Sequence, residues 1–501
     1  MEHLVSDALL SRELALSSAL LRYLLRQGDP PPERHIFVNR NLRMESVRYV
    51  GFDLDWTLAD YRRLPLEKLT FQLATERLVD HHGYPEAVRQ VEFRPDFPRR
   101  GLLIDKRAGT VLRMNRHRFV NLAYHGRERL DRQRLRSLYR FEPIQPASER
   151  FYHLDSLFEL PEANLFAELV ELSKHDGDLP GSPQTIFDDV RAAIDWLHAE
   201  GALKRRVLSQ TASYLDRDVE LGLALSRLAL GGRRLFLLTN SGWSYVDGLC
   251  SYLFDGLLPG LDSWKSLFDL VIVHAGKPDF FRLRRLFGRL DESGKRTAEV
   301  EVPQWGGVYE GGGLDGLMRL IAEPGESVLY VGDHIYGDIV SSKLESTWRT
   351  ALIVHELEEE IPGRLASASA IERQVGLKRS LKRLGLRMDQ LRDLVELRER
   401  LSDEGVDLPS EELATARSEL RRVQREHRRM LARQAMELDE IAARFNPYWG
   451  SFFKQGSSKT RFASQLENYA CLYTSRASNF VFYGSRHYFR LTRDPMMHEL
   501  D

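Results

Sequence analysis

The chain has 501 residues, of which 43% are hydrophobic and 29% charged, and its formal net charge is −1. This length exceeds what one hydrophobic core organises, so we expect two or three domains or a core with large insertions. The balanced charge argues against a nucleic-acid partner and a polybasic membrane anchor, and the two cysteines, Cys250 and Cys471, argue against a disulfide framework.

Residues 1–40 are predicted to form a helical N-terminal segment. Their leucines recur at helical spacing but are interrupted by Arg12, Glu13 and Arg22, which is typical of an amphipathic helix and not of a signal peptide. No later stretch approaches the length of a membrane span. With so few cysteines, this pattern predicts a cytoplasmic protein with no membrane partner.

Five short apolar runs predict the strands of a parallel α/β sheet. They are residues 47–52, 235–238, 270–273, 328–331 and 351–354. Continuously apolar strands are covered on both faces, as the strands of parallel sheets are. A polar cluster follows each of the first four runs, and ligands bind beyond the carboxyl ends of such strands. The four clusters are therefore expected to converge on one site.

The positions of these strands also predict the domain organisation. Residues 41–62 and 231–357 should form the sheet core. Residues 63–230, with helical patterns at 165–172 and 190–197, should form a cap insertion over the site.

Residues 358–501 are predicted to form a helical C-terminal region. The Arg-, Glu- and Leu-rich stretch from Leu377 to Ala443 indicates two long helices, broken near Gly405–Pro409. Apolar stripes on these helices favour a homodimer or homotetramer. The aromatic tail at 445–488 is expected to pack against another part of the chain.

The first polar cluster is Asp53-Leu54-Asp55. Two carboxylates at alternate positions of a strand end share a face. One can attack phosphorus to form an aspartyl-phosphate, while the other protonates the leaving oxygen and later activates water. The alternative for this motif alone is a solvated loop with two acids.

The second and third clusters offer groups that bind phosphate. Thr239-Asn240-Ser241 supplies a hydroxyl and amides where a helix should begin, although the same residues are common N-caps. Lys277 supplies one fixed positive charge that can offset the charge of the nucleophile and the phosphoryl group. The alternative for Lys277 is a surface lysine in a turn.

The fourth cluster contains Asp333 and Asp338 in a glycine-containing loop. Mg²⁺ prefers a few carboxylates, waters and substrate phosphate, so this pair is predicted to hold that ion; the alternative is a Gly-Asp turn. His334 is expected to make a structural hydrogen bond, because Mg²⁺ prefers oxygen. The order of the four clusters along the chain favours phosphoryl transfer.

These clusters match the motifs of the haloacid dehalogenase-like superfamily, whose core is Rossmann-like. The flanking residues resemble the cytosolic purine 5′-nucleotidase family in particular. The segments that carry this resemblance are Phe37–Arg40, Gly51–Ala59, Phe187–His198, Gly332–Asp338 and Phe445–Ser451. They extend over nearly the whole chain.

The resemblance implies a role for each cluster. Asp53 is the nucleophile and Asp55 the general acid/base. The implied phosphoryl-binding residues are Thr239, Asn240 and Lys277, of which Thr239 and Lys277 also serve catalysis. The implied Mg²⁺ ligands are Asp53, the backbone carbonyl of Asp55, and Asp333, with Asp338 close by.

The resemblance also implies that the insertion recognises the nucleobase. The matching residues are Phe158, Arg191, Asp195 and His198, with Lys204 further along. Arg191, Asp195 and His198 share one helix face, where an arginine can donate to a purine carbonyl and an aspartate can accept from a ring N–H. Phe158 can stack on the base. The alternative for this face is an ion pair on a solvated helix.

The sequence departs from the family at three pocket positions. Asp155 and Glu159 stand where asparagines are expected and Ala199 where a tyrosine is expected, which makes the predicted pocket more acidic. The family's nucleotide-effector site is not recognisable.

The implied function is Mg²⁺-dependent hydrolysis of IMP- or GMP-like nucleoside monophosphates. Two alternatives stay open: a phosphatase or phosphotransferase for another phosphomonoester, and a catalytically weak scaffold that binds partners through its C-terminal helices. Retention of Asp53, Asp55, Lys277 and Asp333 argues against the scaffold.

Overall fold

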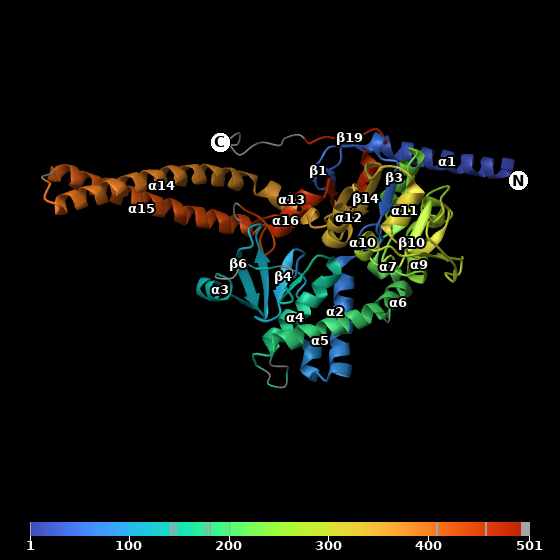
Figure 1. The fold of residues 1–501 in the computed structure, drawn as a ribbon, viewed down its shortest axis with the longest axis horizontal. Coiled ribbons are helices and arrows are strands. Elements are labelled where there is room, and N and C mark those ends of the chain that lie inside the picture. Colours follow the sequence, from blue (N-terminus) through green and yellow to red (C-terminus); the bar gives the residue numbers. More distant parts are fainter. Residues whose placement is uncertain are drawn as a thin grey trace. The chain divides into compact units, whose positions relative to one another are not determined.

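The computed structural model of the chain describes residues 2–140, 144–145, 148–175, 177, 179, 182–199, 201–406, 409–455 and 458–491. The chain divides into two compact units (Figure 1): unit 1 comprises Met1–Glu358 and Phe453–Asp501, and unit 2 comprises Glu359–Phe452. Among the described residues, no helix combines the length and apolar composition needed to cross a bilayer.

Unit 1 is built on a ten-stranded sheet with the order β1-β18-β15-β14-β3-β9-β10-β13-β11-β12. The five predicted apolar runs become β3 (Tyr49–Phe52), β9 (Arg234–Leu238), β10 (Leu270–Val273), β14 (Val328–Gly332) and β15 (Arg349–Ile353). These strands are parallel to their neighbours, in the spatial order β15-β14-β3-β9-β10. The predicted parallel α/β sheet is confirmed.

Five further strands extend this sheet. Parallel strands are added by β13 (Val308–Gly311) beside β10 and by β18 (Leu472–Thr474) beside β15. The edges are antiparallel and consist of β1 (Phe37–Val38) on one side and β11 (Phe287–Leu290) with β12 (Arg296–Val300) on the other. Within the region predicted as helical, the aromatic tail that was expected to pack against another part of the chain thus returns to the sheet through β18. A strand of three residues carries too short a pattern to be recognised in the sequence.

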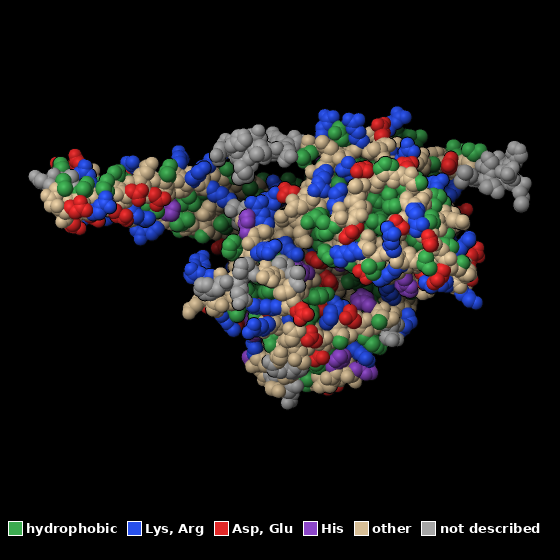
Figure 2. All heavy atoms as spheres, viewed as in Figure 1, with side chains coloured by type: hydrophobic (Ala, Val, Ile, Leu, Met, Phe, Trp, Pro, Cys, Tyr) green, Lys and Arg blue, Asp and Glu red, His purple; other side chains and the backbone are tan. Residues whose placement is uncertain are grey.

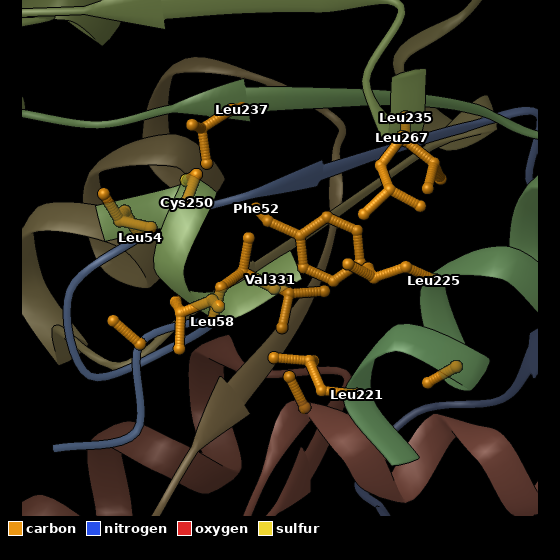
Figure 3. Packing of buried hydrophobic residues seen from close by; sticks show 14 of the residues in the cluster. Phe52, Leu54, Leu58, Leu221, Leu225, Leu235, Leu237, Cys250, Leu267 and Val331 are labelled. Atoms are coloured by element: carbon orange, nitrogen blue, oxygen red, sulfur yellow. The ribbon is translucent and has the colours of Figure 1, made fainter. Parts of the chain in front are cut away.

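Alternate side chains of the central strands face two cores. Phe52, Leu237 and Val331 lie in the core covered by α8 (Val219–Leu230) and α9 (Trp243–Phe254), as Figure 3 shows. Phe236 and Tyr330 lie in the other core, covered by α10 (Asp279–Arg282) and α11 (Leu314–Ile321). We expected α8 within the cap insertion, but its leucines pack on the core sheet instead.

The insertion combines helices with a second sheet. The helical patterns at 165–172 and 190–197 lie within α4 (Leu160–Leu172) and α5 (Pro183–Ala199). The other helices of the insertion are α2 (Arg63–His82), α3 (Arg132–Tyr139), α6 (Ala202–Ser209) and α7 (Thr211–Tyr214). An antiparallel sheet that the sequence did not predict has the order β7-β6-β5-β4-β8. Its strands are β4 (Leu102–Asp105), β5 (Thr110–Met114), β6 (Val120–His125), β7 (Glu128–Arg129) and β8 (Phe151–His153).

Unit 2 is a hairpin of two long helices, α14 (Ala368–Asp403) and α15 (Ser410–Ala442), preceded by α13 (Leu357–Ala366). The prediction of two long helices is confirmed; Asp407 and Leu408, within the predicted break, lie outside the described residues. The remaining elements include α1 (Glu2–Leu24), α12 (Ser341–Glu345), α16 (Arg461–Tyr469), β2 (Leu42–Arg43), β16 (Lys454–Gln455), β17 (Ser458–Lys459) and β19 (Tyr488–Phe489). On the face shown in Figure 2, Lys and Arg side chains are interspersed with Asp and Glu side chains, as the net charge of −1 predicts.

Candidate functional site

The four polar clusters lie at one edge of the large sheet. Asp53 follows β3, Thr239 follows β9, Lys277 comes after β10, and Asp333 follows β14. These four strands are parallel neighbours, so their carboxyl ends meet at the same edge. The structure therefore brings together residues that are distant in sequence, as we expected.

Lys277 is buried among acids. Its Nζ lies 2.9 Å from Asp53 Oδ1 and 2.6 Å from Asp338 Oδ1, and it donates to the Tyr330 hydroxyl at 2.9 Å. Burial lowers the pKa of Lys277, but Asp338 and Asp53 outweigh it and hold the pKa well above its ordinary value. With only 4% of its side chain exposed, Lys277 is a fixed internal charge and not a surface lysine in a turn.

Three buried carboxylates form a candidate cation site. Oxygens of Asp53, Asp333 and Asp338 lie within 4.8 Å of one another. Burial raises the pKa of Asp53 and of Asp333, opposed by Lys277 and Arg100 respectively. Among the described residues, Asp333 Oδ2 has no hydrogen-bond partner. A buried carboxylate oxygen without a hydrogen-bond partner, in a set of oxygen donors, fits a hard divalent cation such as Mg²⁺.

The loop after β14 is shaped around Asp338. A Cβ atom at Gly332 would lie 2.4 Å from Asp338 Oδ2, so glycine is needed there. The His334 backbone N–H donates to Asp338 Oδ2 at 3.1 Å, and His334 Nδ1 accepts from the Gly337 N–H at 3.1 Å. His334 therefore makes the structural hydrogen bond that we expected of it.

The Asp55 carboxylate lies outside the acidic cluster and is held by two hydroxyls. Tyr61 donates to its Oδ1 at 2.6 Å and Ser241 donates to its Oδ2 at 2.5 Å. Lys204, from α6 of the insertion, donates to the Ser241 hydroxyl at 3.0 Å. The Asp55 side chain is thus not part of the acidic cluster, and its backbone carbonyl stays a predicted metal ligand.

Thr239 and Asn240 are not N-caps. Helix α9 begins after Gly242, which makes no side-chain cap. The Asn240 amide instead donates to the Lys277 carbonyl at 3.0 Å and accepts from the Lys277 N–H at 2.7 Å. The buried Thr239 hydroxyl accepts from the Ser241 N–H at 3.2 Å. The Asn240 side chain thus shapes the loop that carries Lys277.

Phe158 and His198 lie beside the loop that carries Asp55. The Phe158 ring makes edge contacts with Trp56, Tyr61 and His198 at centroid distances of 6.0, 6.1 and 5.7 Å. Burial, reinforced by Lys204 and Arg191, lowers the pKa of His198 to about 4. A neutral imidazole at pH 7 can both donate and accept one hydrogen bond.

Arg191 is engaged within the insertion through both of its Nη atoms. Its guanidinium donates to the Tyr152 hydroxyl at 2.8 Å, to Glu162 at 2.5 Å and to Asp195 at 2.6 Å. The Asp195 side chain is 66% exposed. This geometry is the ion pair that we named as the alternative to base recognition.

Glu159, one of the departures from the family, has a local structural role. Its carboxylate accepts from the backbone N–H groups of Asp155 and Ser156 at 2.6 and 2.9 Å, and from the Tyr152 hydroxyl at 3.0 Å. It completes a capping box with Ser156 at the start of the helical segment that carries Phe158.

Arg100 and Glu356 are site residues that the sequence did not reveal. Arg100 precedes β4 in the insertion, yet its guanidinium donates to the Asp333 carbonyl at 2.7 Å and to Glu356 at 2.8 and 2.5 Å. Its Nη1 also lies 3.7 Å from Asp333 Oδ2. No spacing rule connects such distant positions, so the sequence held no signal for this contact.

Comparison with known proteins places this geometry in context. Residues 36–501 match the family model described as the 5′ nucleotidase family. The chain is 30% identical over 462 residues to a 5′-nucleotidase domain-containing protein of Dictyostelium discoideum, spanning 89% of this chain and 72% of that protein. It is also 30% identical to 5′-nucleotidase domain-containing protein 2 of Rattus norvegicus, spanning 93% and 80% of the two chains. The Homo sapiens protein of the same name gives 30%, with coverage of 93% and 85%.

Proposed function

Because the chain belongs to the 5′ nucleotidase family, we propose that it hydrolyses purine nucleoside 5′-monophosphates through an aspartyl-phosphate on Asp53. Family membership makes it a 5′-nucleotidase, a phosphoric monoester hydrolase. The observation that carries the proposed mechanism is the convergence of Asp53, Lys277, Asp333 and Asp338 at one sheet edge. A nucleophile, a fixed cation and an acid pair following separate parallel strands in this order also support a haloacid dehalogenase-like core.

The proposed reaction has two steps. An Asp53 oxygen attacks phosphorus, and the bond to the ester oxygen breaks as Asp55 gives that oxygen a proton. Asp55 then takes a proton from water, whose oxygen attacks the aspartyl-phosphate and returns Asp53 with release of phosphate. Lys277 offsets negative charge on Asp53 and on the phosphoryl oxygens.

We propose that Asp53, Asp333 and Asp338 hold Mg²⁺, with the Asp55 carbonyl. When bound, the ion supplies positive charge to the phosphoryl oxygens and to the carboxylates. Neighbouring residues hold the proposed Mg²⁺ ligands in place: Arg100 donates to the Asp333 carbonyl, and the His334 N–H donates to the Asp338 carboxylate.

The first test is phosphate release from a panel of monophosphates, with and without Mg²⁺. We expect chelation to stop release and Mg²⁺ to restore it, and we expect Asp333→Ala to raise the Mg²⁺ concentration needed for half-maximal release by about tenfold or more. Calorimetric titration with Mg²⁺ measures the same loss of Mg²⁺ affinity without requiring turnover. Activity that survives exhaustive chelation, or a requirement for zinc alone, would contradict the acid-pair assignment.

We also propose that the insertion sets base preference, because groups on the sheet reach only the phosphate. A 6-oxopurine offers a carbonyl acceptor beside an N–H donor, which complements Arg191 and Asp195, and Phe158 offers a stacking surface. A group left mismatched once the bound base covers it costs about 1–3 kcal/mol, so IMP and GMP should exceed AMP in kcat/KM by roughly ten- to a hundredfold. UMP should also have a low kcat/KM, because a pyrimidine offers less area for stacking on Phe158.

The Asp195→Ala variant tests this preference against the ion-pair alternative. We expect it to lose most of the discrimination between IMP and AMP. The matched control is Asp188→Ala, which removes an exposed carboxylate of the same helix that accepts from the Gln184 amide. An unchanged preference in Asp195→Ala would show that Asp195 serves only to pair with Arg191.

Assembly, location and partners stay predictions. A homodimer or homotetramer in the cytoplasm, with a small-molecule substrate, remains our expectation. Several apolar side chains of unit 2 are exposed in the single chain, which supports self-association: Leu386, Leu394, Leu431 and Met436.

A further inference from the structure

The two oxygens of the Asp55 carboxylate are bound by a chain of hydroxyl groups. Tyr61 donates to Oδ1 at 2.6 Å, and the Tyr245 hydroxyl lies 2.7 Å from that of Tyr61. The Tyr61 hydroxyl uses its single proton on Asp55, so the Tyr245 hydroxyl must donate to Tyr61. Ser241 donates to the other oxygen at 2.5 Å.

This chain of hydroxyl groups is buried. Tyr61 is 4% exposed, Tyr245 6% and Ser241 2%. Each oxygen of the Asp55 carboxyl therefore accepts a hydrogen bond from a buried hydroxyl.

Tyr61 also sits where the chain leaves the core for the insertion. The next residue, Arg62, donates its backbone N–H to the Tyr214 carbonyl, and helix α2 begins at Arg63. The Tyr61 ring makes edge contacts with Trp56 and Phe158, at centroid distances of 5.2 and 6.1 Å. The ring is thus fixed by packing, and its hydroxyl has a defined position relative to Asp55.

We propose that Tyr61 is a positioning residue that fixes the Asp55 carboxyl against rotation, so that it meets the leaving oxygen of the substrate. The inference rests on the proposed function. A carboxyl that transfers a proton must be aligned with the receiving atom while the phosphorus–oxygen bond breaks, and misplacement by about 1 Å can lower the rate a hundredfold.

The test compares Tyr61→Phe with wild type on two substrates that differ in one atom. One is IMP, and the other is its 5′-thio analogue, in which sulfur replaces the leaving oxygen. An alkoxide needs a proton as it departs, whereas a thiolate, from a thiol of pKa about 8.5, leaves without one. The parameter is kcat/KM, which covers steps through departure of the leaving group.

We expect Tyr61→Phe to lower kcat/KM about 10- to 100-fold for IMP and less than about threefold for the thio analogue. Tyr245→Phe should act in the same direction with a smaller effect. The control is Tyr84→Phe, which removes a buried hydroxyl that donates to Asp189 in the insertion. This variant should leave kcat/KM unchanged for both substrates.

Equal losses on both substrates, or no loss on IMP, would overturn the inference while the proposed function stands. A wild-type protein that releases phosphate from neither substrate would instead overturn the proposed function, and the inference with it. The melting temperature of each variant separates a folding defect from misalignment, because a folding defect lowers kcat/KM for both substrates alike.

Discussion

Replacing Asp53 by asparagine is expected to abolish phosphate release while leaving the fold intact. An amide cannot form the acyl-phosphate that the proposed mechanism requires, and loss of an enzymatic nucleophile lowers kcat by at least about a thousandfold. Burial raises the pKa of Asp53, so its ionised form is disfavoured in the folded protein. A neutral asparagine should therefore leave the melting temperature unchanged or raise it.

Two measurements check this expectation on each variant, steady-state phosphate release and thermal unfolding. The matched control is Asp80→Asn, which makes the same exchange at an exposed carboxylate paired with Arg89 and should keep full activity. Undiminished release by Asp53→Asn would rule out Asp53 as the nucleophile. Lost activity with a strongly lowered melting temperature would assign Asp53 a structural role instead.

Replacing Arg100 by leucine is expected to lower the free energy of unfolding by about 3–5 kcal/mol, because it leaves the Glu356 charge buried without its partner. Arg100 has no exposed side-chain area, and Glu356 has 7%. Urea unfolding followed by tryptophan fluorescence gives the difference. Arg89→Leu, which breaks the exposed pair with Asp80, should cost no more than about 1 kcal/mol.

The effect of Arg100→Leu should depend on pH in a defined direction. Burial alone raises the pKa of Glu356, but Arg100 outweighs it and lowers the pKa from 4.5 to about 2. A carboxyl with a depressed pKa stabilises the fold above its unfolded pKa and loses that contribution as the pH falls through the folded value. Without Arg100, burial raises the pKa of Glu356 above its unfolded value, so the ionised Glu356 destabilises the variant. Protonation removes this cost, so the difference in unfolding free energy between wild type and variant should narrow as the pH falls from 7 toward 4.5. A gap that does not change with pH would show that Glu356 is not the group left unpaired.

The strands and clusters that were predicted correctly have local signals. Each apolar run is continuous over several residues, and each polar cluster follows its run directly, so Asp53 and Asp333 could be placed on one edge from chain order alone. The sequence could not reveal Arg100, because its contact with Asp333 joins the insertion to a loop of the core. β18 was missed for a related reason, since it is a strand through its pairing with β15 and β1, which are both distant in the sequence.

The base-recognition face shows a different kind of limit. The spacing of Arg191 and Asp195 predicts that they share a helix face, and their 2.6 Å hydrogen bond agrees. The same spacing suits a ligand site and an internal ion pair equally well. Only the positions of Tyr152 and Glu162, which both accept from Arg191 Nη1, reveal how the guanidinium is engaged.

The position of β18 has a consequence for synthesis on the ribosome. β18 separates β15 from the edge strand β1, and Cys471, whose N–H reaches Thr350 of β15, lies 121 residues later in the chain. A nascent chain therefore carries β15 as an unpaired, apolar edge throughout translation of the helical hairpin. Unpaired edges invite pairing with other chains, so premature release in this interval should favour aggregation, and a chaperone that shields strand edges should matter most then.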